Sequence, residues 1–314
     1  MAIHDRWTDR LKLPVIAAPM TKVSGPELVA AACREGVIGS FPTHNAPSVD
    51  ALDDWMKRIL AEAPRGLSAP VAPNLVVHRS NSRLGEDLDC LIRHQVELVI
   101  TSVGSPAAVV GPLHAVGAEV YADVASLRHA RAALDAGADG LVLLSAGAGG
   151  QTGWANPLAF VRAVREWFEG PLVLAGGISD GHAVLAAQAL GVDLAYIGTR
   201  FIATAESCAG ADYRQALVDS TMDDVRLSDR VGGIPASVLS AWLDRQHAEG
   251  ESGSDTSGFA QDRLLSNANA WSAGHSVSGV HTLTTVEDLV AELAYQYRAA
   301  RAELTSLCGS RAWT

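Results

Sequence analysis

Short apolar runs recur along the chain at the spacing of alternating strands and helices. Successive runs begin 21 to 32 residues apart, which leaves room for one strand, one helix and two loops. Each run is apolar on consecutive positions, as expected for a strand that is buried on both faces of a parallel sheet. We expect eight strands, at Pro14–Pro19, Val37–Phe41, Ala69–Val77, Leu98–Val103, Glu119–Val124, Gly140–Leu144, Pro171–Ala175 and Leu194–Ile197.

The segments between these runs are rich in alanine and leucine at helical spacing. A helix is predicted over Pro26–Glu35, with Ser24 as its cap, and others over Leu127–Ala136 and Gly181–Leu190, each followed by glycine. Eight strand-and-helix units in series favour an α/β fold of the (β/α)₈ TIM-barrel type over an open sheet, where six strands are commoner.

The pattern changes after residue 208. We expect residues 1–208 and 276–314 to form the barrel, and residues 209–275 to form an insertion after strand eight. Within the insertion, Ala236–Arg245 has helical character and the polar, glycine-rich Glu249–Gly258 is expected to be a mobile loop. The chain then closes with a helix over Thr285–Thr305, capped by Thr284 or Thr285. Such an insertion lies over the catalytic face, where it is either a lid or a surface excursion.

Composition narrows the classes of partner. The 314 residues are 48% hydrophobic and carry a formal net charge of −11, which argues against nucleic acid and anionic membranes and leaves a small-molecule substrate. The four cysteines are too scattered for a zinc site or a disulfide framework. With no signal peptide and no apolar run long enough to span a bilayer, a cytoplasmic protein is expected, and a homodimer stays open.

Glycines follow the last two predicted strands, at Gly176-Gly177 and at Gly198-Thr199. Glycine lets backbone amides approach an anion closely, and the helices that follow would point the positive ends of their dipoles at it. Strands seven and eight are where this fold binds phosphate. The alternative interpretation is that these glycines only form tight turns.

Strand six ends in Ser145–Trp154, where a run of five glycines and alanines leaves space for a flat or large ligand, or else only forms a turn that binds nothing. Gln151 and Thr152 are its first polar groups after the glycines. Asn74 ends strand three, where its amide could bond a cofactor ring or cap a turn. Met20 ends strand one, where a thioether could pack on an aromatic ring or simply belong to the core.

These motifs, taken in order, resemble the nitronate monooxygenases. The resemblance is carried by LPVIAAPM, APNL, SAGAGGQTG, LAGGISDG, IGTRFIAT and WSAGHSVSGV, and it runs over nearly the whole chain. It implies an FMN enzyme without a metal, which oxidises alkyl nitronates with O₂ to a carbonyl compound and nitrite. It also implies that the FMN phosphate lies at Gly176, Gly177, Gly198 and Thr199, and the ring near Ala18, Pro19, Met20, Asn74 and Gly150.

One position departs from the family pattern. Gln151 stands where members of the family usually carry the histidine that is the proposed base for a neutral nitroalkane, and glutamine cannot accept a proton near neutral pH. A nitronate is already deprotonated, so Gln151 could hold its nitro oxygens instead. Another histidine could supply the base. The main candidates are His44, at the end of strand two, and His275, in the lid-side segment; His78 and His182 are further candidates.

Three other functions stay open at this stage. Related barrels are NAD(P)H-dependent FMN reductases of the quinone or enoyl type. A flavin-free isomerase or lyase could use the same phosphate turns, although Asp123 is the only obvious carboxylate at a strand end and no lysine ends a strand. That scarcity of titratable groups favours a cofactor that brings its own chemistry. A non-catalytic FMN-binding protein is the third alternative.

Overall fold

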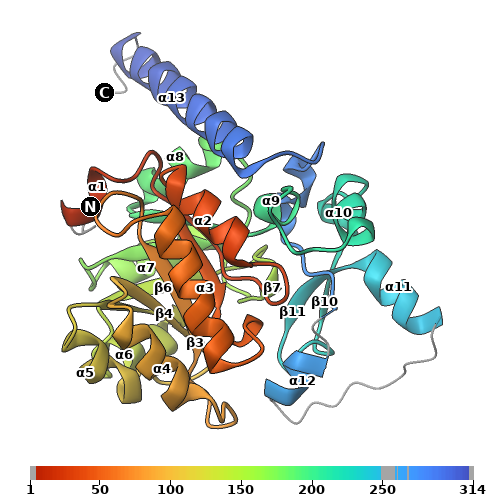
Figure 1. The fold of residues 1–314 in the computed structure, drawn as a ribbon. Helices are drawn as coiled ribbons and strands as arrows, with labels where there is room; N and C mark the ends of the chain where they lie inside the picture. The colour runs from red at the N-terminus through yellow and green to blue at the C-terminus, as the bar shows by residue number, and fades with distance from the viewer. Residues whose placement is uncertain (1–4, 249–258, 260, 267–268, 311–314) are drawn as a thin grey trace.

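The computed structural model of the protein describes residues 5–248, 259, 261–266 and 269–310. Its centre is a closed barrel of parallel strands in the order β1-β2-β3-β4-β5-β6-β8-β9, surrounded by helices (Figure 1). The predicted (β/α)₈ fold is therefore confirmed.

The barrel strands follow the predicted apolar runs to within two residues at each end. Buried side chains occupy nearly every strand position, which explains why the runs are continuous rather than alternating. The strands are β1 Val15–Ala17, β2 Ile38–Pro42, β3 Val71–Val76, β4 Leu98–Ser102, β5 Glu119–Val124, β6 Gly140–Leu144, β8 Leu172–Ala175 and β9 Leu194–Ile197.

The helices around the barrel cover its outer surface. They are α2 Pro26–Arg34, α3 Val49–Glu62, α4 Leu84–Arg93, α5 Ala107–His114, α6 Leu127–Asp135, α7 Pro157–Arg165, α8 Gly181–Leu190 and α13 Val286–Ser310. Two further helices are short, α1 Asp5–Thr8, which contributes to the inner core, and α9 Thr199–Ile202 at the end of β9. The expected Ser24 cap of α2 is wrong, because Gly25 is the N-cap residue. The Ser24 hydroxyl instead accepts from the Met20 amide, which folds the end of β1.

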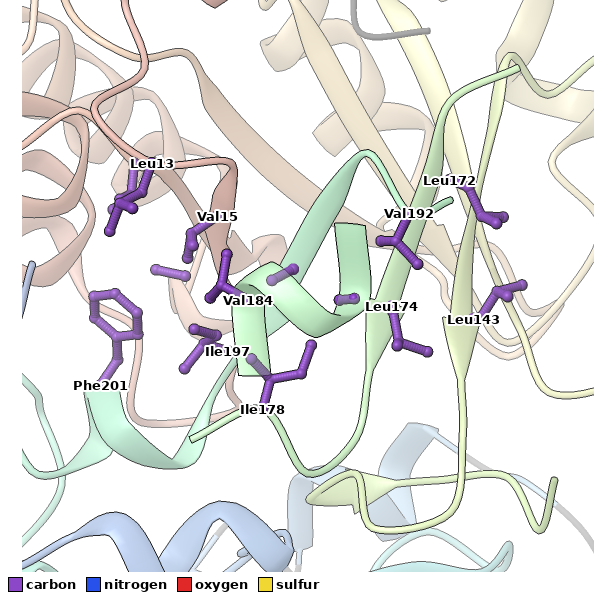
Figure 2. Packing of buried hydrophobic residues seen from close by; sticks show 14 of the residues in the cluster. Leu13, Val15, Leu143, Leu172, Leu174, Ile178, Val184, Val192, Ile197 and Phe201 are labelled. Carbon is purple, nitrogen blue, oxygen red and sulfur yellow. The ribbon is translucent and has the colours of Figure 1, made fainter. Parts of the chain in front are cut away.

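Alternation along each strand separates two cores. On β8, Leu172 and Leu174 belong to the outer cluster that also contains Val184 of α8. Figure 2 shows members of this cluster from β8, β9 and α8, among them Leu174, Ile197 and Val184. Each such leucine stabilises the fold by about 1.5–3 kcal/mol through burial. Val173 and Ala175 of the same strand belong to the inner core.

The inner core is filled from below by an aromatic pair. Trp7 of α1 is fully buried, and its ring centroid lies 6.3 Å from that of Tyr121 on β5. Both rings pack with inward side chains of the strands. A ligand therefore finds its space above this layer, toward the carboxyl ends of the strands.

The insertion between β9 and α13 has more regular structure than the sequence predicts. It contains α10 Ala211–Val218, η2 Met222–Asp224, β10 Val225–Ser228, β11 Ala236–Leu239, α11 Ser240–Ala248, α12 Gln261–Ser266 and the start of η3 His275–Gly279. β11 pairs with β10 and with β7, Gly150–Gln151, in an antiparallel sheet. The helix expected over Ala236–Arg245 is wrong in its first half, because this pairing draws Ala236–Leu239 into the sheet. The loop predicted at Glu249–Gly258 lies outside the described residues.

Helix α13 closes the barrel by packing on α8 and α2. It begins one residue after the predicted start, and the Thr285 hydroxyl accepts from the Asp288 amide at 3.1 Å, as expected for a capping residue. Among the residues that the structure describes, no helix is long and apolar enough to cross a membrane.

The contact between α8 and α13 depends on a glycine. A methyl group at Gly181 would lie 2.6 Å from the Leu293 carbonyl oxygen, so Gly181→Ala must push the helices apart. We predict that it lowers the free energy of unfolding by about 1–3 kcal/mol, the usual cost of overpacking. The control is Gly85→Ala in α4, where no described atom outside the neighbouring residues and the helix's own backbone lies within 4 Å of the added methyl group and alanine favours the helix. Urea denaturation of both variants checks this, and equal stabilities would contradict it.

Candidate functional site

One cavity at the carboxyl ends of the barrel strands gathers nearly all of the predicted site residues. It is bounded below by inward side chains of the strands and above by the insertion, which contributes Val231, Leu264 and Ala270. The predicted residues that line it are Ala18, Pro19, Met20, His44, Asn74, Gly150, Gln151, Gly176, Gly177, Gly198 and Thr199.

A buried asparagine fixes the loop after β1. The Asn45 amide nitrogen donates to the carbonyl oxygens of Met20 and Ser24, both at 2.9 Å, and its oxygen accepts from the Lys22 amide at 2.9 Å. This clamp holds Lys22 at a φ of 60°, a conformation that non-glycine residues rarely adopt. Asn45 was not among the predicted site residues, although it follows the candidate His44 directly.

Asn74 is oriented by the neighbouring strand. The Ser102 hydroxyl on β4 donates to the Asn74 Oδ1 at 3.0 Å, and both side chains are buried. With its oxygen occupied, Asn74 presents its amide nitrogen as a donor in the cavity wall.

The turn after β8 has the backbone freedom that an anion cradle needs. Gly176 has a φ of 126° and Gly177 a φ of 70°, and no protein atom lies within 4 Å of a methyl group placed on Gly177. Two backbone amides at the start of α8, the helix that follows this turn, have protein partners. The Gly181 amide donates to Gln296 and the Ala183 amide to Asp180, so protein groups already occupy part of this helix start.

The end of β9 is tied to the segment before η3. The Thr199 hydroxyl accepts from the Gly274 amide at 3.0 Å. Thr199 is buried and keeps its hydroxyl hydrogen for a further acceptor. Arg200 links this end to neighbouring elements, because its guanidinium donates to the Ser179 carbonyl oxygen and to Glu292 on α13.

The glycines after β6 serve the packing of the chain as well as the cavity. A methyl group at Gly149 would lie 2.7 Å from the Gly274 amide, and one at Gly147 would lie 2.9 Å from the His275 ring. Small residues are thus required for the close approach of this turn to the segment at residues 273–275. The backbone of the turn after β6 still lines the cavity, and Gly150 in this turn has a φ of 64°.

Gln151 lies in the short strand β7, paired with Ala236 of β11. Its side chain is half-buried and lines the cavity. The pairing fixes the backbone of Gln151 between the barrel and the insertion.

His44 is a neutral group in the same cavity. Its Nε2 lies 3.2 Å from the Thr21 hydroxyl, and its buried Nδ1 has no hydrogen-bond partner in the part of the chain that the structure describes. Burial, helped by the positive charges of Arg83 and Lys22, lowers the pKa of His44 to about 4. The imidazole is therefore uncharged at neutral pH and is a weak base.

The other candidate histidines lie elsewhere. His275 is exposed and sits behind the glycine-rich turn, outside the residues that line the cavity. His182 is exposed on α8. His78 contacts Ser80 and packs edge-on against Phe259, where α12 meets the loop after β3.

Two polar residues of the cavity floor complete the site. Asp123 on β5 and Tyr196 on β9 line the cavity from inside the barrel. The sequence analysis noted Asp123 as a carboxylate at a strand end and missed Tyr196. Its place in the strand LAYI, two residues after the inward Leu194, is the signal that could have found it.

A group of potential metal ligands lies apart from the cavity. Asp53, Cys90 and His94 place ligand atoms within 4.8 Å of one another. However, Lys57 and Arg93 form ion pairs with Asp53 at 2.6 and 3.8 Å, and burial raises the pKa of the Cys90 thiol to about 11. The charge of the Asp53 carboxylate is thus already balanced by two cations, and the Cys90 thiol stays protonated, so the group is poorly suited to bind a metal ion.

Comparisons with known proteins place the chain among flavin enzymes. The model of the nitronate monooxygenase family matches residues 6–295. A nitronate monooxygenase of Pseudomonas aeruginosa is 30% identical over 262 residues, which cover 68% of this chain and 73% of that protein. A Rhodococcus jostii protein, (3aS,4S,5R,7aS)-5-hydroxy-7a-methyl-1-oxo-octahydro-1H-indene-4-carboxyl-CoA dehydrogenase, is 27% identical over 73% of this chain, and the match spans 63% of its own length.

Solved structures agree on the architecture. Nitroalkane oxidase from Streptomyces ansochromogenes superposes with a TM-score of 0.80 at 25% identity, covering 95% of this chain and all of that one. FabK from Thermotoga maritima gives a TM-score of 0.80 at 23% identity, covering 98% of this chain, and supports the fold. Since the family model covers most of its length, the chain belongs to the nitronate monooxygenase family of flavin-dependent oxidoreductases.

Proposed function

We propose that this protein binds FMN in the cavity and oxidises alkyl nitronates with O₂ to a carbonyl compound and nitrite. The observation that carries the proposal is the composition of the cavity wall. Among the described residues that line it, none is lysine, arginine or glutamate, and His44, Asp123, Tyr196 and Tyr213 are the titratable ones. So few charged groups favour a cofactor that supplies the chemistry.

The residues present fit FMN. Gly177 opens onto free space beside Gly176, and the hydroxyl of Thr199 has a hydrogen to donate, which suits a phosphate. Ala18, Met20 and the amide of Asn74 form a wall that suits a flat ring with polar edges. When bound, the flavin supplies the electron transfer between the nitronate and O₂.

The chain's own residues would position the substrate. Gln151 faces the cavity from β7 and can donate two hydrogen bonds to nitro oxygens, but it cannot take a proton. The neutral His44 lacks the basicity to replace it at pH 7. The proposal is therefore that nitronates, already ionised, are the substrates, and that neutral nitroalkanes are poor ones.

The insertion would act as a lid. Its Leu264 and Val231 complete the apolar wall, and α12 is attached to the loop after β3, where the Gln261 amide donates to Ser80 and its side chain to Asn81. Covering the site in this way excludes water from the reacting atoms.

A second candidate is a reductase or dehydrogenase that acts on a phosphate-bearing molecule. A recess of about 560 Å³ adjoins the cavity and shares Thr21 and Tyr213 with it. Lys22 and Arg245 line this recess, and Arg245 lies over the Trp271 ring. Cations beside an aromatic ring suit the phosphates and base of a dinucleotide or of coenzyme A, and the Rhodococcus relative is named a carboxyl-CoA dehydrogenase.

Gly177→Ala tests the phosphate cradle. We predict that the added methyl group, which points into open space, raises the Kd for FMN about tenfold, equivalent to about 1.4 kcal/mol. Gly66→Ala is the matched control, because Gly66 has a φ of 79° and also nothing within 4 Å. The positive φ costs both variants about 1–3 kcal/mol of stability. Equal FMN affinities in the two variants, measured by fluorescence titration, would refute the cradle.

Gln151→His tests the missing base. For the wild type we expect kcat/KM to be at least about a hundredfold higher with a nitronate than with the parent nitroalkane, the usual contribution of a general base. Gln151→His should raise the nitroalkane rate and add a limb to the pH profile near the ordinary histidine pKa, about 6.5. Gln151→Ala is the control without a base. Comparable wild-type rates for both substrate forms, measured by oxygen consumption, would contradict the proposal.

A further inference from the structure

The floor of the cavity holds two polar atoms that no group among the described residues satisfies. The Asp123 Oδ1 and the Tyr196 hydroxyl are both buried without a hydrogen-bond partner. A buried polar group without a partner destabilises a fold, so such groups are rare and call for an explanation. Because both residues line the same cavity, a ligand bound there is the natural partner.

Strand geometry directs both side chains inward. Tyr121 on β5 and Leu194 on β9 belong to the inner core. Residues two positions apart on a strand point to the same face, so Asp123 and Tyr196 also point into the barrel. The surface that Asp123 still exposes belongs to the cavity wall. The other polar floor residues are already paired, since Ser102 donates to Asn74.

Among the described residues that line the cavity, none is a lysine or an arginine that could face this pair. The remaining titratable groups in the described wall are His44, which is neutral, and Tyr213, whose hydroxyl donates to the Ser272 carbonyl oxygen. Burial without a counter-charge raises the pKa of Asp123 to about 8. Burial, and then the charge of Asp123, also raises the pKa of Tyr196. At neutral pH the floor thus presents a carboxylic acid and a phenol, each with a hydrogen to donate.

We propose that Asp123 and Tyr196 are hydrogen-bond donors to the flavin, and that they stabilise the negative charge which reduction places on it. Reduction by two electrons and one proton adds one negative charge to the bound cofactor. Donors fixed in a water-excluded site act strongly on charge that develops beside them. A tyrosine beside a protonated aspartic acid is a known arrangement for this task in another enzyme. The inference rests on the flavin of the proposed function but not on its nitronate substrate.

The midpoint potential of the bound flavin, measured against pH with dithionite and a reference dye, tests this. Below pH 8, two electrons bring in one proton. Above about pH 8, where Asp123 is ionised in the oxidised protein, reduction should also return a proton to its carboxylate, so that the slope against pH doubles. Asp123→Asn cannot ionise and should keep the lower slope throughout.

The two tyrosines of the cavity give a matched pair of variants. Tyr196→Phe removes an unpartnered donor, and should lower the equilibrium constant for reduction about tenfold, or about 30 mV, at every pH while the change of slope persists. Tyr213→Phe removes a hydroxyl that already donates to a backbone carbonyl and should leave the potential unchanged.

A single slope in the wild type, or a doubled slope that survives in Asp123→Asn, would overturn the inference. If Asp123→Asn fails to fold, the wild-type infrared difference spectrum decides instead: a protonated carboxyl band must appear on reduction above pH 8, and its absence overturns the proposal. A doubled slope in a protein that nitronate does not reduce would leave the inference standing and refute the nitronate substrate. A protein that binds no flavin would overturn both.

Discussion

The alternation of side chains along eight closed parallel strands is the constraint on which the rest of the structure depends. Outward residues such as Leu174 hold the helices, and inward residues fill the barrel from Trp7 upward. The chain must then turn at the carboxyl end of every strand, and these turns surround one space. Site residues from β1, β3, β8 and β9 meet there although up to about 180 positions of sequence separate them.

The second constraint is electrostatic. The described cavity wall holds no lysine or arginine, and its aspartate and histidine are both driven toward their neutral forms by burial. At neutral pH the Asp123 carboxyl is mostly protonated and the His44 imidazole is a weak base, so neither is a ready proton acceptor for a neutral substrate. The site is suited to a cofactor that carries its own reactivity and to a substrate that arrives ionised, and the protein's part is to hold both and to exclude water.

The sequence predicted the barrel well, because strands buried on both faces leave continuous apolar runs that need no tertiary information. The turns at the strand ends could also be predicted, since a turn such as Gly176-Gly177 requires positive φ, which glycine adopts easily. The strand at Ala236–Leu239 could not be predicted, because pairing with the distant Gly150–Gln151 overrides its local helical character. The hydrogen bonds of Asn45 and the presence of Asp123 and Tyr196 together on the cavity floor could not be predicted either, because they form only when the closed barrel brings separate strands together. His275 shows the converse: its segment does reach the site, but its side chain lies outside the cavity.

The central claim is that the cavity holds a flavin which an ionised nitronate reduces directly. Its most direct test is the visible absorption spectrum of the purified protein, followed by anaerobic addition of propyl-2-nitronate and, separately, of NADPH. We expect a yellow protein that the nitronate alone bleaches and that recovers its colour when O₂ is admitted. Bleaching by NADPH alone would contradict the claim and favour a reductase, and a colourless protein that FMN cannot reconstitute would remove the flavin itself.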